Sequence, residues 1–376
     1  NTFTSPQDTS LELFMPTISG TVKATDTLTF SGVGYFRRFK SNVIDGNLSE
    51  VDECGPNDER LCMEEDDVPE GESPVVTDLN GRVIEEDEFD GPLGSIERIN
   101  AKAKSWGGSV EAVEKSPLFG RPNQFLIGAS YDHGEVRYDT SSELGVLGPK
   151  FVVEGSGIVV GAPSLIAPRA LDTENDYWGV YFSNTLDITD QFALTVGGRY
   201  NHATIKMTDL TGKFDELNTT NKYERFNPMI GGTYKIFSNL ALYGGYSEAN
   251  RAPTAAELGC AEEDNPCFIE SFLTDDPPLK QVVSHTAEIG LRGENRVYDG
   301  RLTWSAGLFR TLNTDDILNV ASEVTGRGYF LNAGDTLRQG VELAATYTTR
   351  RFQVYGSYAF IDATFDSDVV LPAPNT

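Results

Sequence analysis

The chain has 376 residues, of which 57 are acidic and 30 basic, so its formal net charge is −27. This charge opposes binding to nucleic acid or to an anionic membrane surface. No apolar run approaches the roughly 18 residues that a membrane-spanning helix needs, which excludes a helical membrane protein. No Pro/Ser-rich linker divides the chain, so we expect one large architecture.

Alternation of side chains at period two recurs along the chain and predicts β-strands. In 191–206, for example, Phe192, Leu194 and Val196 share an apolar face, while Thr195 and Arg199 lie on a small, polar face. Strands are expected over 11–23, 27–40, 95–113, 123–139, 172–186, 191–206, 223–235, 239–247, 281–293, 301–311, 328–347 and 352–360.

The connections between these strands alternate between short and long. The short turns fall at 24–27, 116–122, 187–190, 237–239, 294–300 and 348–351. The long loops fall at 41–94, 140–171, 207–222, 248–280 and 313–327. In an up-and-down meander this order sends every long loop to the same end, as in outer-membrane barrels. A sandwich with Greek-key crossovers does not keep its two ends so different.

The fold class that follows is all-β, a transmembrane antiparallel up-and-down β-barrel. We count about twelve strands, or about fourteen if 150–160 contributes a hairpin. A soluble β-rich binding protein is the competing interpretation, and it would purify as a folded monomer without detergent.

Four cysteines form two close pairs, Cys54 with Cys62 and Cys260 with Cys267, each inside an acidic segment of a long loop. Two local disulfides are expected, which would stiffen loop tips in an oxidising compartment. A zinc site is the competing interpretation, but no histidine lies near either pair in the sequence.

Acidic residues are densest between residues 50 and 90, where Glu64, Glu65, Asp66 and Asp67 stand in a row. Such a run is ordinarily a solvated loop. A bound Ca²⁺ or another hard cation is the sharper hypothesis, although the spacing matches no defined calcium loop. No other cofactor is expected.

The sequence does not favour an enzyme. His133, His202 and His285 lie on separate expected strands, without a nearby cysteine or a Gly-x-Ser-x-Gly motif. The glycine pairs at 197–198 and 231–232 interrupt strands and fit bends of a barrel wall rather than a phosphate-binding loop.

Three motifs resemble those of TonB-dependent receptors. The run from Leu242 to Leu258 reads LYGGYSEANRAPTAAEL, and it is similar to the family's signature where a strand enters an extracellular loop. Residues 279–281 with 286–293 look like the family's next strand, and 332–343 resemble its N-x-G and G-V-E-L element. The match is strongest over about 190–365.

The resemblance implies a 22-stranded barrel plugged by an N-terminal domain, with a TonB box that contacts TonB. Residues 1–376 are expected to be part of that barrel, with the plug domain and the last strands outside the chain. The implied location is the outer membrane of a Gram-negative bacterium, in contact with its lipid. The implied function is active uptake of a scarce nutrient. The commonest ligand in the family is a ferric siderophore, and the less common ones are cobalamin, other metal complexes, oligosaccharides or a small organic cofactor. A passive porin-like or ligand-binding barrel without energy coupling is the alternative.

The candidate ligand-binding residues are Arg251, Tyr246 and Glu248. A guanidinium at the base of an external loop can hold an anionic ligand by two hydrogen bonds. The structural alternative is that Arg251 pairs with Glu248 or Glu257. Aromatic residues at expected strand ends suit either an interfacial girdle or a ligand vestibule: Tyr35, Phe36, Tyr177, Trp178, Tyr181 and Tyr246.

Overall fold

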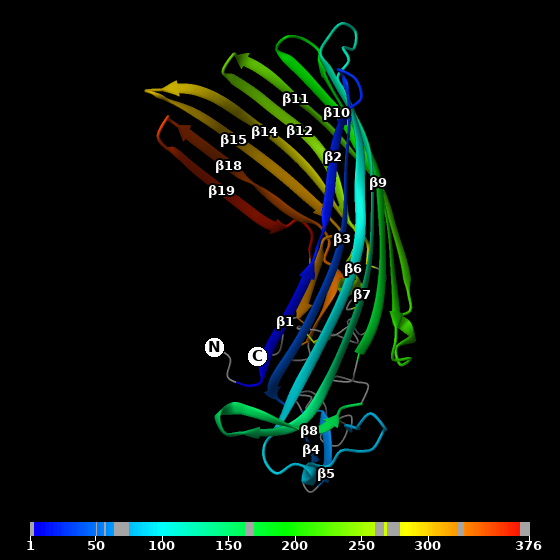
Figure 1. Cartoon of the computed structure of the whole chain (residues 1–376). Coiled ribbons are helices and arrows are strands. Elements are labelled where there is room, and N and C mark those ends of the chain that lie inside the picture. Colours follow the sequence, from blue (N-terminus) through cyan, green and yellow to red (C-terminus); the bar gives the residue numbers. More distant parts are fainter. Residues whose placement is uncertain are drawn as a thin grey trace.

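The main element is a 14-stranded antiparallel sheet (Figure 1). The computed structural model describes residues 4–49, 51–55, 58–63, 75–161, 169–259, 267–268, 279–321 and 327–368. Along the sheet the strands follow chain order, β1-β3-β6-β7-β9-β10-β11-β12-β14-β15-β18-β19, with β2 paired to β3 and β8 paired to β7. The predicted antiparallel meander is confirmed. Residues 150–160 contribute one strand, β8, which folds back on β7 rather than forming a hairpin of their own.

The strands of this sheet are β1 (Gln7–Phe14), β2 (Thr17–Lys23), β3 (Leu28–Leu48), β6 (Leu93–Glu114), β7 (Asn123–Gly148), β8 (Val152–Val159), β9 (Arg169–Asp187), β10 (Phe192–Asp209), β11 (Thr220–Phe237), β12 (Leu240–Arg251), β14 (Val282–Val297), β15 (Gly300–Thr314), β18 (Thr336–Thr348) and β19 (Gln353–Phe365). Smaller elements lie in the connections: β4 (Val51–Gly55), β5 (Asp58–Met63), β13 (Cys267–Phe268), β16 (Ile317–Ala321), β17 (Arg327–Asn332), α1 (Ala255–Leu258) and the 3-10 turns η1 (Glu86–Glu88), η2 (Pro149–Phe151) and η3 (Asp215–Leu217).

The two kinds of connection lie at opposite rims of the sheet (Figure 1). Short turns such as 188–191, 238–239 and 349–352 form one rim, which we call the short-turn rim. The long connections form the other, the long-loop rim, where β4, β5 and β8 lie. The strands reach further into the long-loop rim than the sequence predicts, since β3 continues to Leu48 and β7 to Gly148.

Two predicted strands are each interrupted. The segment 11–23 is split into β1 and β2, which pair with successive parts of β3 on either side of Met15 and Pro16. Proline cannot donate a backbone hydrogen bond, so a strand is readily broken there. The prediction of one strand over 328–347 was wrong, because β17 pairs with β16 and β13 in a separate sheet, and only β18 joins the wall.

The polar face of the sheet is concave. The Tyr35 hydroxyl donates to Asp132 at 2.7 Å across β6, and Arg199 donates to the Ser130 hydroxyl at 2.8 Å across β9. Side chains of two strands that are separated by a third strand can meet only on the concave side of a curved sheet. Gly107 and Gly179 leave room for these crossings, since a Cβ there would collide with the Asp132 carboxylate or the Arg199 guanidinium.

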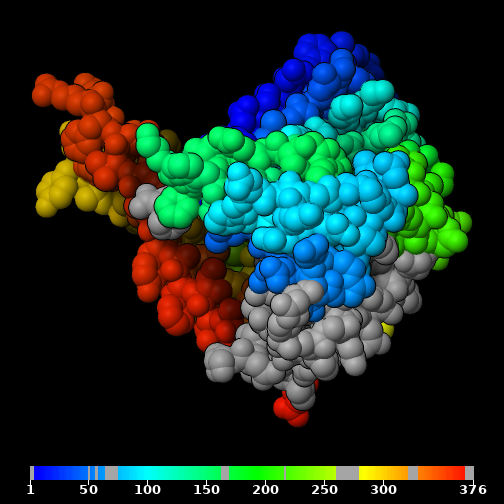
Figure 2. Space-filling model, turned by 90° about the horizontal axis from the view of Figure 1, so that it is seen from below, coloured from blue at the N-terminus to red at the C-terminus, as the bar shows by residue number. Residues whose placement is uncertain are grey.

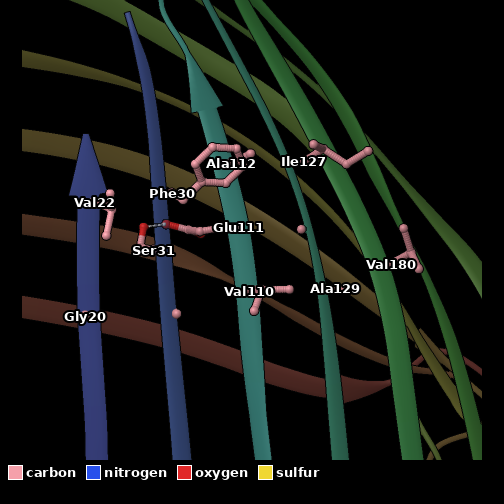
Figure 3. A pocket seen from close by; sticks show the side chains of 12 residues that line it. Gly20, Val22, Phe30, Ser31, Val110, Glu111, Ala112, Ile127, Ala129 and Val180 are labelled. Atoms are coloured by element: carbon pink, nitrogen blue, oxygen red, sulfur yellow. Dashed lines mark hydrogen bonds between the residues drawn. The ribbon is translucent and has the colours of Figure 1, made fainter. Parts of the chain in front are cut away.

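The convex face is apolar over its middle. Val180, Val196 and Ile230 lie on it and are exposed, in register rows that alternate with the polar ones. A hollow of about 680 Å³ lies in this face. Figure 3 shows its lining, in which small residues lie among larger apolar ones. Its lining includes Gly20, Val22, Phe30, Gly32, Val110, Ala112, Ile127, Ala129 and Val180. An apolar outer face and a polar inner face are the arrangement expected of a membrane barrel wall.

The long loops contain their own hydrophobic clusters. The hairpin cluster lies around β4 and β5 and consists of Val51, Leu61, Met63, Val76, Ile84, Phe89, Leu144 and Val160. The mouth cluster consists of Leu171, Ile205, Met207, Leu217, Leu258, Leu279, Val282 and Ile317. Figure 2, seen from the long-loop rim, shows the segment 75–100 (blue to cyan) beside the β7–β8 hairpin (green), where Asp78 bridges to Val160.

Within the described residues the sheet is open, because β1 and β2 at one edge do not pair with β19 at the other. No helix in the described part of the chain is long and apolar enough to cross a membrane.

Candidate functional site

The candidate site lies where β12 enters its long loop. Thr254 caps the short helix α1, and its hydroxyl accepts from the Glu257 amide at 3.2 Å. The Glu257 carboxylate accepts from the Thr254 amide and from the Arg251 guanidinium, both at 2.7 Å. Arg251 is therefore held by Glu257, which is the structural alternative stated above, while 46% of its side chain stays exposed. A role for Arg251 in ligand binding stays a prediction.

The mouth cluster anchors this loop against the concave side of the wall. Leu258, at the end of α1, is fully buried and packs in the cluster with Ile205 and Met207 of β10. Leu279, at the return of the loop, lies in the same cluster, and its carbonyl accepts from the Tyr223 hydroxyl at 3.0 Å. The two described ends of this loop thus pack against the concave side of the wall.

Below this loop, the backbone pairing between β11 and β12 stops. Its last pair towards the long-loop rim is Met229 with Ser247, although β11 continues along β10 and β12 continues along β14. Across the gap, Arg225 donates to Glu248 at 2.7 Å, and the Asn227 amide donates to Asn250 at 2.7 Å. We call this stretch the β11–β12 seam.

Asn250 is the centre of the seam. Its side-chain oxygen also accepts from Asn201 at 2.9 Å, and its amide donates to Gln281 at 2.8 Å. Gln281 in turn donates to the Glu224 carbonyl at 3.1 Å, so the seam is tied to both flanking strands. A cavity of about 310 Å³ opens beside it, lined by Arg199, Asn201, Asn227, Met229, Ser247 and Asn250 among others.

Tyr246 and Glu248 lie on the convex side of β12, in register rows that include Ile230 and His285. The Tyr246 hydroxyl donates to Glu248 at 2.9 Å and lies 2.9 Å from His285 Nδ1. Of the six aromatic residues named above, Phe36, Trp178 and Tyr246 are convex, and Tyr35, Tyr177 and Tyr181 are concave. The first three suit an interfacial girdle, and the others a vestibule.

All three histidines lie on the convex face, each beside a carboxylate. His133 lies 2.9 Å from Asp176, His202 lies 3.7 Å from Glu224, and His285 lies 3.5 Å from Glu248. They remain on separate strands, so the described residues bring none of them together.

Several acidic loop residues that the structure describes serve as hydrogen-bond acceptors within the loop. The Arg60 side chain and amide donate to Asp58 and lower the pKa of its carboxyl to about 2. Arg82 pairs with Asp78 at 3.3 Å and with Glu88 at 2.7 Å. The hydrogen bond from Arg82 also lowers the pKa of Glu88. These contacts fit a folded, solvated loop.

Cys54 and Cys62 form a disulfide across the β4–β5 hairpin. Of the other expected pair, Cys260 lies outside the described residues, so that disulfide stays a prediction, and Glu64, Glu65, Asp66 and Asp67 lie outside them too. Among the residues described, the exposed carboxylates of Glu59, Glu85 and Asp87 approach within 4.8 Å of one another.

Asp209, at the end of β10, organises the β10–β11 loop. Its carboxylate accepts from Thr211, from the Lys213 amide at 2.9 Å and from the Phe214 amide at 3.1 Å. Burial alone would raise the pKa of this carboxyl, but the hydrogen bonds outweigh burial and lower it. A depressed pKa means that the loop is stabilised above the unfolded value of about 3.9 and loses this stabilisation as the pH falls through the lower folded value.

We therefore expect the backbone amides of 209–218 to exchange faster with solvent below about pH 4, after correction for intrinsic exchange. In Asp209→Asn this acid-dependent change should disappear, and the loop should exchange faster already at neutral pH. Asp215→Asn, an exposed residue of the same loop, is the control and should keep the acid response. Equal acid responses in Asp209→Asn and the unmodified chain would contradict the assignment.

The sequence does not reveal the seam. Glu248 and Asn250 belong to the motif run 242–258, but their partners Arg225 and Asn227 lie about two dozen residues earlier on a strand expected to pair throughout. The signal available in the sequence was that Asn227 and Asn250 lie equally far from the 238–239 turn, so that they fall opposite each other when the two strands fold back.

Comparison with known proteins gives the family. A model of the family described as TonB dependent receptor-like, beta-barrel, matches residues 20–375. Among solved structures, the chain is similar to the siderophore receptor PiuA from Acinetobacter baumannii, with a TM-score of 0.62 and 14% identity over 96% of this chain and 48% of that chain.

The ferric-catecholate import receptor Fiu from E. coli K12, in its closed form, gives a TM-score of 0.65 and 15% identity over 98% of this chain and 49% of that chain. The ferric citrate transporter FecA gives 0.57 and 14% over 96% and 43%. The chain thus spans about half the length of these proteins, and at such identities the likeness shows the fold alone. The family model, which covers nearly the whole sequence, shows that the chain belongs to the TonB-dependent receptors, the outer-membrane transport receptors of Gram-negative bacteria.

Proposed function

We propose that this chain forms part of the barrel wall of a receptor that actively takes up a ferric siderophore or another metal complex across the outer membrane. The observation that carries the proposal is the polar concave wall, against whose mouth the described parts of the long loops pack in a hydrophobic cluster. Loops that pack inward in this way offer a structured binding surface, which a passive water-filled pore does not need. The ligands named for the similar structures supply the substrate class.

Energy for this uptake is proposed to come from TonB, acting through a plug domain and TonB box that belong to the same receptor but lie outside residues 1–376. In this proposal the barrel wall holds the plug and the loops hold the ligand. Family membership supports the coupling, since the family is one of transport receptors rather than enzymes.

Uptake of radioactive iron tests the proposal. Cells that lack the receptor gene should lose accumulation of one class of ferric complex when catecholate, hydroxamate and citrate complexes are compared. Cells that retain the receptor but lack TonB should lose the same uptake. Uptake that depends on the receptor but not on TonB would instead identify a passive barrel, and normal uptake of every complex would remove the iron assignment.

A matched pair of variants tests Arg251 as a ligand contact. Arg251→Gln removes the cation and also breaks the pair with Glu257, whereas Glu257→Gln weakens that pair and keeps the cation. If Arg251 contacts an anionic ligand, Arg251→Gln should weaken ligand binding about tenfold or more, because a hydrogen bond to a charged group contributes about 1.5–3 kcal/mol. Glu257→Gln should weaken binding less. Equal effects would assign Arg251 a purely structural role. Tyr246→Phe should leave binding unchanged, because Tyr246 lies on the convex face.

A further inference from the structure

A cluster of cations lies on the convex face of β3 and β6. Arg38 and Lys104 are direct register partners, and so are Lys40 and Lys102. We call these four residues the basic patch. Arg137 of β7 lies on the other side of Lys102 and extends it. Between Phe36 and Ile44 on β3, and between Arg98 and Trp106 on β6, the convex positions hold no Asp or Glu.

This arrangement is unfavourable in the protein alone. Like charges directly opposite each other on neighbouring strands destabilise a sheet. Within the described residues, Lys40 has an ion pair, with Glu12 at 3.5 Å, and no ion pair joins Arg38, Lys102 or Lys104 to a carboxylate. Glu135 is the register partner of Lys104, but its carboxylate contacts His133 at 3.4 Å. Three neighbouring cations, Arg38, Lys102 and Lys104, are thus without an ion pair to any residue that the structure describes, in a chain whose acidic residues outnumber basic ones by 57 to 30, and an anionic partner would stabilise them.

The position of the basic patch indicates the partner. Phe36 and Trp106 are register partners one step nearer the short-turn rim, and the Trp106 ring lies 5.3 Å from that of Tyr131. Exposed aromatic side chains of this kind mark the boundary between hydrocarbon and headgroups. A step of two residues is about 7 Å along a strand. The cations therefore lie at headgroup depth, on the side of the long loops.

We propose that the basic patch binds the phosphate groups of an anionic lipid in the outer leaflet. Arg and Lys both bind phosphate oxygens strongly, and clusters of cations beside a membrane segment recognise anionic headgroups. The patch lies on the opposite face of the wall from the candidate ligand site, so this lipid is a partner of the receptor and not its cargo. Although the net charge of −27 opposes an anionic surface, the patch provides a local exception.

The test uses the full-length receptor, purified from outer membranes in detergent. Its thermal unfolding is measured with lipid A, with dephosphorylated lipid A and with inorganic phosphate. Lipid A should raise the unfolding temperature, and the other two should not. The triple variant Arg38→Gln, Lys102→Gln, Lys104→Gln should bind lipid A about a hundredfold more weakly, at roughly fivefold for each cation near an anionic surface.

A control variant removes the same charge from the same face. Lys206→Gln, Lys222→Gln and Arg310→Gln neutralise three exposed convex cations on separate strands, of which Lys206 is paired with Glu174, and should keep lipid A binding. Without lipid, the triple variant should be at least as stable as the unmodified receptor, because its like charges no longer face each other. Folding of both variants is checked by the heat-dependent shift of the barrel on a gel.

Several results would overturn the proposal. They are equal lipid A affinity in the triple variant and the unmodified receptor, equal stabilisation by dephosphorylated lipid A, equal stabilisation by inorganic phosphate, and a protein rather than a lipid bound at the patch. The comparison of the two lipids uses only the unmodified receptor, so it decides the question even if the triple variant fails to fold.

Discussion

Val196→Arg is expected to lower the free energy of unfolding of the wall by about 2–4 kcal/mol, which is the cost of placing a cation on the lipid face near the middle of a bilayer. Val196 is exposed on the convex face of β10, beside Ile230 and Asn184 in neighbouring strands. It lies four residues from Phe192 and four from Tyr200, the aromatic residues at the two ends of the apolar stretch on this strand.

The adjacent residue provides the control. Thr195 lies on the concave face, where its hydroxyl is 2.9 Å from that of Thr185. Thr195→Arg places the same charge on the same strand but on its polar side. It should lower the free energy of unfolding by about 1 kcal/mol or less, which is the usual net contribution of one hydrogen bond between neutral groups. Urea unfolding of the full receptor in lipid vesicles measures both variants. If the two variants were equally stable, the assignment of convex to lipid and concave to interior would be wrong.

Leu258→Ala is expected to destabilise the mouth cluster by about 2–5 kcal/mol, the usual cost of this substitution in a core. Leu258 is fully buried and joins the loop that follows β12 to the wall of β10. The loss should appear as faster hydrogen exchange in 252–259 and 210–219, with little change in β15 or β18. Local exchange is the suitable measurement, because the barrel strands pair independently of this cluster.

Leu210→Ala is the control for this prediction. Leu210 has the same side chain in the neighbouring loop but is 42% exposed, so its truncation should change exchange by less than about 0.5 kcal/mol. Equal responses to the two substitutions would mean that the mouth cluster does not hold the loop.

The middle of each strand could be predicted from the sequence, and the parts beyond it could not. In 192–200 the convex side faces lipid and the concave side faces the interior, so apolar and polar residues must alternate, and they do. Beyond Tyr200 the convex side no longer faces lipid, and the concave Ile205 and Met207 are buried in the mouth cluster, so the alternation changes and the sequence predicted β10 only to 206, short of its end at Asp209. The same reason explains why β3 and β7 are longer than predicted.

The candidate site was only partly predictable for a different reason. The Cys54–Cys62 disulfide joins neighbours in sequence, so spacing was enough to suggest it. The tie between Arg225 and Glu248 depends on β11 and β12 parting beyond Met229, which is a property of the three-dimensional sheet. The burial of Val51 and Leu61 under an acidic loop likewise depends on Leu144 arriving from a distant strand.

The β11–β12 seam divides the outer half of the wall into two panels, because backbone pairing between β11 and β12 stops at Met229 and Ser247. Elsewhere neighbouring strands move together because their backbones are hydrogen-bonded, and such ladders respond little to the composition of the solvent. Along the seam, cohesion depends on one guanidinium–carboxylate contact and a few amides. The relative motion of the panels should therefore grow with ionic strength, since salt weakens the charged contact, while the rest of the wall keeps its stiffness.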